Sequence, residues 1–305
     1  MIVPIFSGGV GRSGTTVIGD LFKNHTEVFV GMPYEVKFIT ELFGLVDFSF
    51  GIRNFQKTQI TTYGQFLATI SKFDTPKIRF IKFKKMLFSQ CWDKTEYNPG
   101  GGISMSIDKT TMNKMLDEFY LQLDNPIEAA RNFTFNYIKN HKEYNGQKYW
   151  IDTSPENIMY ADLIYRIFPE TKFIEMRRNP LDNIGSVLKQ SWGPNNEDFA
   201  IKWWSDRIKK ADSAIKKIPE SSHMLLTLED LIKDDRDYSY NKLCSLIGIS
   251  NNQAKVIEYF DNNLIIKNAN FDRWKNDFTN PINFKNKFDN FIKHSNYNYG
   301  LNLTL

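Results

Sequence analysis

A glycine-rich run near the start of the chain constrains its fold more than any other feature. The run from Gly9 to Thr16, GVGRSGTT, follows the apolar stretch from Ile2 to Phe6 and precedes an apolar-periodic segment. This order predicts a strand, a tight turn and the start of a helix. Glycines allow positive φ, and the N–H groups at a helix N-terminus bind anions. The sequence therefore predicts a phosphate-binding turn.

Two known phosphate patterns fit this run to different degrees. In the nucleoside-triphosphate pattern G-x-x-x-x-G-K-[ST], Thr15 stands where the lysine belongs, so the grip on the β- and γ-phosphates is missing. The dinucleotide pattern G-x-G-x-x-G is complete with Gly9, Gly11 and Gly14, and Glu35 follows about 20 residues later, where an acid can bind a ribose. A glycine turn that binds no ligand is a further alternative.

A third interpretation takes Arg12-Ser13-Gly14-Thr15-Thr16 as the functional unit. It brings a cation, three hydroxyl groups and free backbone N–H groups to one small anion. This unit resembles the first loop, [RK]-S-G-T-T, of the sulfotransferases that use 3'-phosphoadenosine 5'-phosphosulfate (PAPS). The resemblance is to their P-loop-like domain, in the bacterial and tyrosylprotein-like branch.

A second segment, TKFIEMRRNPLDNIGSVLKQ from residue 171, separates these interpretations. It predicts a strand to residue 176, a turn, and an amphipathic helix that a proline starts. It resembles the sulfotransferase pattern R-[ND]-P-x-D-x-x-x-S, and this resemblance implies that Arg178 and Ser186 bind the 3'-phosphate of the nucleotide. An arginine fork and a hydroxyl donor suit that task. The residues in register are Arg178, Asn179, Pro180, Asp182 and Ser186.

Three weaker similarities follow in the expected order. Residues 152–157, DTSPEN, are similar to the family segment D-K-[ST]-P-x-N, with Thr153 in place of the lysine. Residues 223–231, HMLLTLEDL, resemble the Y-E-D-L segment, but Leu228 replaces the aromatic residue that would stack on adenine. Residues 273–275 resemble the R-W-[KR] piece of a late loop that closes over the nucleotide, which implies a cofactor contact for Arg273.

The resemblance implies an enzyme that moves a sulfuryl group from PAPS to a hydroxyl or amine by in-line transfer. Arg12 would stabilise the leaving group, and Glu35 would be the base, with Glu41 as the alternate. The acceptor class stays open between a carbohydrate, a tyrosine peptide and a small alcohol. An NAD(P)-dependent oxidoreductase and a non-catalytic nucleotide-binding module remain as alternatives. The residues implied to hold the 5'-phosphosulfate are Gly11, Arg12, Ser13, Gly14, Thr15 and Thr16.

Strand and helix signals alternate along the chain, which predicts an α/β fold with a central parallel sheet flanked by helices. A chain of 305 residues with 41% hydrophobic content suits one domain over residues 1–305. We expect a helical acceptor-side insertion at about residues 40–145, broken at Asn98–Gly102. Strands are expected at 2–7, 28–31, 148–152, 172–176 and 223–228, and helices at 15–24, 156–168, 181–190, 196–217, 237–247 and 251–262.

Composition excludes several other classes. A net charge of +4 suits an anionic cofactor, and the basic residues form no single stripe of the kind that binds nucleic acid. Two cysteines and four scattered histidines show no metal-ligand spacing, so no metal is expected. No apolar run reaches 18 residues, so we expect neither a signal peptide nor a membrane anchor, and a cytoplasmic location. The oligomeric state is left open.

Overall fold

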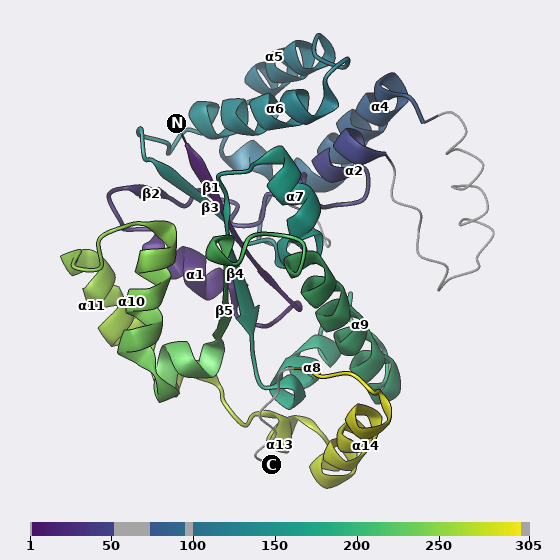
Figure 1. Cartoon of the computed structure of the whole chain (residues 1–305), viewed down its shortest axis with the longest axis vertical. Coiled ribbons are helices and arrows are strands. Elements are labelled where there is room, and N and C mark those ends of the chain that lie inside the picture. The colour runs from purple at the N-terminus through teal and green to yellow at the C-terminus, as the bar shows by residue number, and fades with distance from the viewer. Residues whose placement is uncertain (1, 52–73, 95–99, 300–305) are drawn as a thin grey trace.

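A computed structural model describes residues 2–51, 74–94 and 100–299 of the chain. Its centre is a five-stranded sheet with the order β2-β3-β1-β4-β5 (Figure 1). Every neighbouring pair is parallel, so the predicted fold class, a central parallel sheet flanked by helices, is confirmed. The strands are Val3–Gly9 (β1), Val28–Phe29 (β2), Tyr149–Asp152 (β3), Lys172–Arg177 (β4) and His223–Thr227 (β5).

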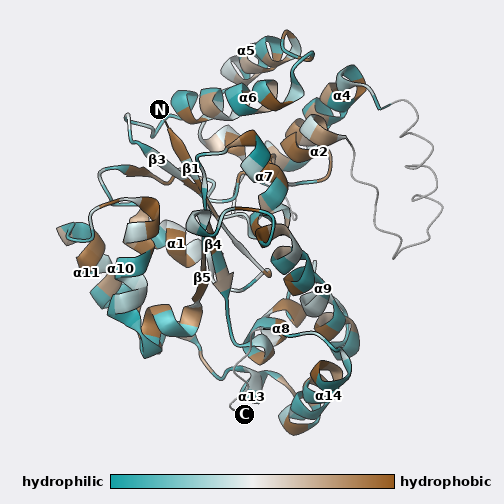
Figure 2. Ribbon diagram, in the orientation of Figure 1, coloured by the Kyte–Doolittle hydropathy of each residue, from teal (hydrophilic) through white to brown (hydrophobic). Residues whose placement is uncertain are grey.

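Successive strand residues are buried on opposite faces of the sheet, because side chains alternate along a strand. Ile5 of β1 packs in one core cluster with helices α1 (Thr15–Phe22), α10 (Arg236–Ile247) and α11 (Ala254–Asn263). Its neighbour Phe6 packs in another cluster, with α6 (Pro126–Asn140) and α7 (Ala161–Ile167). Both faces are therefore covered, and β5, α1 and the first part of β1 are markedly hydrophobic in Figure 2.

The described part of the predicted insertion is largely helical. It contains α2 (Leu45–Phe50), α4 (Pro76–Met86), a π-helical turn, α5 (Lys109–Tyr120) and α6. Phe83, Phe119 and Phe133 contact one another edge to face or tilted, at centroid distances of 5.1–5.3 Å. They share one core cluster with Phe6, so these helices pack onto the sheet. Residues 52–73 and 95–99, including the first part of the predicted break at Asn98–Gly102, lie outside the described residues.

Most later elements lie within three residues of their predicted bounds, among them α8 (Pro180–Leu188) and α9 (Glu197–Ile215). The predicted helix at 156–168 is wrong in its first part, because Pro155–Tyr160 forms a 3-10 helix. This segment packs directly on β1: a Cβ at Gly8 would lie 2.5 Å from the backbone nitrogen of Ile158. The tighter 3-10 geometry follows from that close approach and the proline at its start.

Three C-terminal helices follow, which no predicted element anticipated: α12 (Ile266–Ala269), α13 (Trp274–Asp277) and α14 (Pro281–His294). Asn280 caps α14 by accepting a hydrogen bond from the backbone N–H of Asn283 at 3.0 Å, and Pro281 takes the first helical position. Phe284 and Phe288 anchor this helix beside α8 and α9 (Figure 1). Across the described part of the chain, none of the helices combines the length and apolarity that crossing a bilayer needs.

Candidate active site

The glycine-rich run forms the predicted strand, turn and helix. β1 ends at Gly9 and α1 begins after Gly14, whose φ of 98° lies in the left-handed region that favours glycine. The turn closes with a 3.0 Å hydrogen bond from the N–H of Ser13 to the carbonyl of Val10. Arg12 also has a positive φ, 72°, and its side chain is exposed. The N-terminus of α1 therefore opens onto the carboxyl edge of the sheet.

Gly9 permits a very close approach between β1 and β4. A Cβ at this position would lie 2.3 Å from the carbonyl oxygen of Met176 and 2.4 Å from the hydroxyl oxygen of Ser13. Gly9 and Met176 are register partners in the two parallel strands. Because parallel strands end at the same edge, this pairing brings the glycine-rich turn beside the segment that starts with Arg177.

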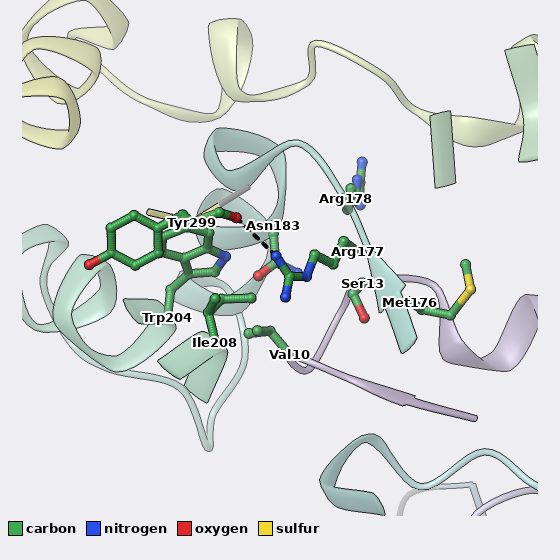
Figure 3. A pocket seen from close by; sticks show the side chains of 9 residues that line it. All are labelled: Val10, Ser13, Met176, Arg177, Arg178, Asn183, Trp204, Ile208 and Tyr299. Carbon is green, nitrogen blue, oxygen red and sulfur yellow. Dashed lines mark hydrogen bonds between the residues drawn. The ribbon is translucent and has the colours of Figure 1, made fainter. Parts of the chain in front are cut away.

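The two adjacent arginines that follow Met176 point in different directions (Figure 3). The Arg177 side chain donates to Glu175 Oε1 at 2.7 Å and to the carbonyl of Tyr299 at 2.9 Å, and it pairs with Asp212. Although burial opposes it, the hydrogen bond from His223 and the charge of Arg177 hold the pKa of Glu175 below its ordinary value. Arg177 is thus part of a structural ion network.

Arg178 turns the other way and is only 10% exposed. One guanidinium nitrogen donates to the carbonyl of Asn270 at 2.9 Å, whereas its Nε is buried without a hydrogen-bond partner among the described residues. The rest of the R-N-P motif starts a helix: the Asn179 side chain accepts from the N–H of Leu181 at 2.9 Å, and Pro180 takes the first helical position. The helix start thereby fixes where Arg178 leaves the strand.

The two motifs meet through side chains. Arg12 Nε donates to Ser186 Oγ at 3.2 Å, and the Asn183 amide donates to the carbonyl of Gly11 at 3.0 Å. Ser13 Oγ and Asn183 Oδ1 are buried and have no partner in the described part of the chain, as is true of Arg178 Nε. All three side chains border one small cavity (Figure 3). It is lined by Val10, Ser13, Met176, Arg177, Arg178, Asn183, Trp204, Ile208 and Tyr299.

Asn183 belongs to this site although sequence reasoning did not select it. Its position one helical turn before Ser186 was a usable signal, because residues three apart lie on the same helix face. The side chain is 1% exposed and spans from α8 to the glycine-rich turn. Buried polar atoms without partners cost about 1–3 kcal/mol each, so the atoms left free on Ser13, Arg178 and Asn183 suit a polar ligand.

Glu35 lies on a short turn that the end of β3 holds in place. The buried Asp152 carboxylate accepts from the N–H of Val36 at 3.2 Å, and Ser154 Oγ accepts from the N–H of Lys37 at 3.4 Å. Thr153, which stands in place of the lysine of the family segment, donates its N–H to the carbonyl of Tyr34 at 2.9 Å and its hydroxyl at 3.2 Å. Asp152 at the end of β3 and the two residues that follow it thus fix the backbone on both sides of Glu35.

The environment of Glu35 favours an acid–base role. Burial raises the pKa of Glu35 to about 7, and the charges of Glu156 and Asp152 act in the same direction, whereas Lys37 and Arg12 lower it. Lys37 Nζ lies 3.8 Å from Glu35 Oε2. A carboxyl with a pKa near neutrality can accept and release a proton at physiological pH. Arg12, the predicted cation of the glycine-rich turn, is among the charges that act on Glu35.

The alternate base, Glu41, lies further along the same segment. Its side chain accepts from the N–H of Leu42 at 3.0 Å, and its own N–H donates to the carbonyl of Lys37 at 2.9 Å. These contacts place Glu41 in the turn that leads toward α2.

The predicted late loop docks on α8 near Arg178. The Asp182 carboxylate accepts from the N–H of Asp272 at 2.9 Å and from the N–H of Trp274 at 3.0 Å. Arg273 itself is 48% exposed, and its Nε donates to Asp277 at 3.1 Å. The structure therefore brings the loop to the site, while the Arg273 guanidinium pairs within α13.

Two tryptophans that the motif analysis left unused border the glycine-rich turn. A Cβ at Gly11 would lie 3.0 Å from the Trp192 ring and 3.7 Å from the Trp203 ring. Trp192 is 48% exposed, and the guanidinium of Arg207 lies 4.1 Å from the centroid of Trp203. Arg207 is 3.7 Å from Glu156, one of the charges that act on Glu35. The glycine-rich turn is therefore bordered by aromatic surface.

Comparison with known proteins assigns the family. A family model described as the sulfotransferase family matches residues 4–253, which is most of the chain. This chain therefore belongs to the sulfotransferase family. A search of curated proteins found no match. Within the described ranges, no group of three His, Cys, Asp or Glu side chains is arranged to hold a metal ion.

Solved structures similar to this chain include two sulfotransferase domains and one further sulfotransferase. The sulfotransferase domain of the Synechococcus PCC 7002 olefin synthase is 15% identical, with a TM-score of 0.47, covering 96% of this chain and 94% of that one. The domain from the curacin biosynthetic pathway is 13% identical, with a TM-score of 0.48 and coverages of 98% and 99%. The sulfotransferase from Alicyclobacillus acidocaldarius is 12% identical, with a TM-score of 0.45 and coverages of 96% and 96%.

Proposed function

We propose that this protein is a sulfotransferase that takes its sulfuryl group from PAPS and transfers it in line to an acceptor hydroxyl or amine. The observation that carries the proposal is the meeting of two motifs at the carboxyl edge of β1 and β4, where Arg12 of the turn bonds to Ser186 of α8. Both belong to motifs that suit one doubly phosphorylated ligand. The acceptor is expected to be a carbohydrate, a tyrosine peptide or a small alcohol.

The residues present fit the donor. Backbone N–H groups of Gly11 and of residues 14–16 at the start of α1 suit its 5'-phosphosulfate, and the free hydroxyl of Ser13 adds a donor. Arg178 and Ser186 would hold the 3'-phosphate, and the unpartnered Nε of Arg178 supports this assignment. PAPS supplies the sulfuryl group when bound and leaves as 3'-phosphoadenosine 5'-phosphate. Arg273, on the docked loop, is a further candidate for contact with the nucleotide.

Two side chains would perform the chemistry. Arg12 provides a fixed positive charge beside the phosphate turn, where negative charge grows on the leaving group. Glu35, with a pKa raised by burial to about 7, would take the proton of the acceptor hydroxyl. Transfer to an oriented acceptor needs no covalent enzyme intermediate, because positioning and electrostatic stabilisation lower the barrier.

The dinucleotide interpretation fits the topology less well. An NAD-binding fold places the ribose-binding acid at the end of the strand next to β1. Here that neighbour is β3, and its last residue, Asp152, is fully buried and bonded to Val36, Ser154 and Asn157. Glu35 follows β2, which lies at the sheet edge beyond β3. The interpretation also gives no role to Arg178 and Ser186.

A thermal-shift experiment tests the proposal. We expect 3'-phosphoadenosine 5'-phosphate to raise the melting temperature without magnesium, because the turn carries hydroxyl and N–H donors and no P-loop lysine. ATP with magnesium, NAD and NADP are the comparison ligands. Stabilisation by NAD or NADP alone would favour the oxidoreductase, and stabilisation by ATP with magnesium alone would contradict the proposal.

An arginine variant sharpens the same experiment. Arg178→Ala should weaken 3'-phosphoadenosine 5'-phosphate by about 1.5 to 3 kcal/mol, the contribution of a charge-assisted hydrogen bond, and barely change the affinity for adenosine 5'-phosphate. Lys202→Ala is the matched control, because Lys202 is a 58% exposed cation that pairs with Asp206 on α9. Equal losses for both nucleotides in Arg178→Ala would show that Arg178 does not read the 3'-phosphate.

A further inference from the structure

Lys37 has an unusual conformation for a lysine. Its φ is 58°, in the left-handed region that residues with a side chain seldom occupy. The side chain is 20% exposed and its ammonium lies 3.8 Å from the Glu35 carboxylate. Residues held in such sparsely populated conformations cluster at functional sites, where the surrounding structure maintains them.

Hydrogen bonds on both sides maintain this conformation. The N–H of Lys37 donates to Ser154 Oγ at 3.4 Å. Its carbonyl accepts from the N–H of Thr40 at 3.1 Å and from the N–H of Glu41 at 2.9 Å. The backbone of the turn is thus tied to the end of β3 and to the next turn of chain, and the Lys37 side chain is directed back toward Glu35.

The charges that act on Glu35 come from four elements. Arg12 comes from the glycine-rich turn, Glu156 from the 3-10 helix after β3, Asp152 from the end of β3, and Lys37 from the turn of Glu35 itself. The two carboxylates oppose a negative charge on Glu35, and the two cations support it. Thr153 supplies no charge at this point, because its side chain is a neutral hydroxyl. Its N–H and hydroxyl both bond to the carbonyl of Tyr34.

We propose that Lys37 is a positioning residue for the reaction, which holds the Glu35 carboxylate in its charged, proton-accepting form. The proposal rests on the proposed function of Glu35 as the base. The turn would then carry both the base and its counter-ion. Without Lys37, the charges of Glu156 and Asp152 oppose the ionisation of the partly buried Glu35, with Arg12 as its remaining countercharge in this set.

The direct test is a carbon-13 NMR titration of the Glu35 carboxyl group in the whole chain. The signal is assigned by its loss in Glu35→Gln. In Lys37→Met we expect the pKa of Glu35 to rise by at least about half a unit, because an opposite charge within about 4–6 Å lowers a carboxyl pKa. Lys37→Arg should keep the wild-type value. Lys23→Met is the matched control, since Lys23 is a 41% exposed lysine that pairs with Asp20 on α1.

A second variant distinguishes the effect of the Lys37 charge from an effect on folding. Lys37→Gly removes the ammonium and suits a φ of 58°, so it should fold well and give the same rise as Lys37→Met. An unchanged or lowered pKa of Glu35 in both variants would overturn the proposal. Because the titration needs neither nucleotide nor acceptor, that outcome is distinct from a failure of 3'-phosphoadenosine 5'-phosphate to bind, which would overturn the proposed function.

An activity measurement extends the test once 4-nitrophenol, a tyrosine peptide or a sulfatable oligosaccharide is found to be an acceptor. The acid limb of kcat/KM should move to higher pH in Lys37→Met, because a higher pKa leaves less Glu35 ionised at a given pH. Activity should recover as the pH is raised. A loss that is uniform across pH would instead mark Lys37 as structural and contradict the proposal.

Discussion

Neighbouring residues in this site make different contacts, as Arg177 and Arg178 show. The sequence pattern predicts a ligand contact for Arg178 and not for Arg177, because only Arg178 is in register with Pro180 and Ser186. In the structure, Arg177 belongs to an ion network with Glu175. The alternation of strand side chains explains the difference. The Asn183 contact to Gly11 could not be predicted in the same way, because it depends on how α8 packs against the glycine-rich turn.

Glu35→Gln should separate catalysis from stability. If Glu35 takes the acceptor proton, turnover should fall by about 10²-fold or more while nucleotide affinity is kept. The folded-state pKa of about 7 lies above the ordinary value of 4.5, so wild-type stability decreases as the pH rises from 4.5 through 7. Glu35→Gln has no carboxyl at this position, so its stability should not show this decrease with pH. It should therefore be more stable than wild type at pH 8 and show no such gain at pH 4.5.

Turnover and stability can be measured on one preparation, turnover by steady-state kinetics and the free energy of unfolding by urea unfolding at the two pH values. Glu41→Gln is the control, because its side chain bonds to the neighbouring N–H of Leu42. Unchanged turnover in Glu35→Gln with an alkyl acceptor, combined with a loss in Glu41→Gln, would move the base to Glu41.

Secondary-structure elements were predictable where hydrophobic periodicity was long and turn residues were clear. The strand ending at Gly9 and the helix α8 lie close to their predicted bounds for that reason. The 3-10 helix at Pro155–Tyr160 was not predictable, because its geometry follows from contact with Gly8 of β1. The C-terminal helices have local signals in the sequence, such as Asn280-Pro281 before α14, which are typical of a helix start.

The contribution of the close contact between β1 and β4 to stability can be tested by adding one methyl group at Gly9. Gly9→Ala would place a Cβ 2.3 Å from the Met176 carbonyl, so the strands or the turn must shift. We expect a loss of about 1–3 kcal/mol in the free energy of unfolding, the usual cost of overpacking, and weaker nucleotide binding. Gly100→Ala, where a Cβ meets nothing within 4 Å, should stay within about 0.5 kcal/mol of wild type. Equal stability of the two variants in urea unfolding would contradict this account.

The whole molecule depends on pairings between distant parts of the sequence. Alternating strands and helices predicted a parallel sheet, but the order β2-β3-β1-β4-β5 was not predictable, because local patterns do not state which strand lies beside which. In the described part of the chain, both neighbours of β1 come late, β3 at Tyr149–Asp152 and β4 at Lys172–Arg177. β1 and its glycine-rich turn are therefore completed by residues far along the chain.

A fragment that ends at residue 147 should accordingly lack a folded sheet. It contains β1 and β2, which pair with β3 in the full structure and not with each other. We expect poorly dispersed amide signals in its proton NMR spectrum and no binding of 3'-phosphoadenosine 5'-phosphate. A fragment ending at residue 299 should give well-dispersed amide signals and bind this nucleotide. A cooperative thermal transition in the short fragment would contradict this expectation.

The position of β1 at the centre of the sheet also orders events during synthesis. The ribosome makes the glycine-rich turn well before its partners Met176 and Ser186, and Ser186 follows Arg12 by 174 residues. Until then the apolar β1 strand has unpaired edges, which are prone to aggregation and are a usual reason for chaperone contact. Slow translation after α8 would give the nascent chain time to pair β1 with both β3 and β4, so we expect codon usage in that stretch to affect the yield of folded protein.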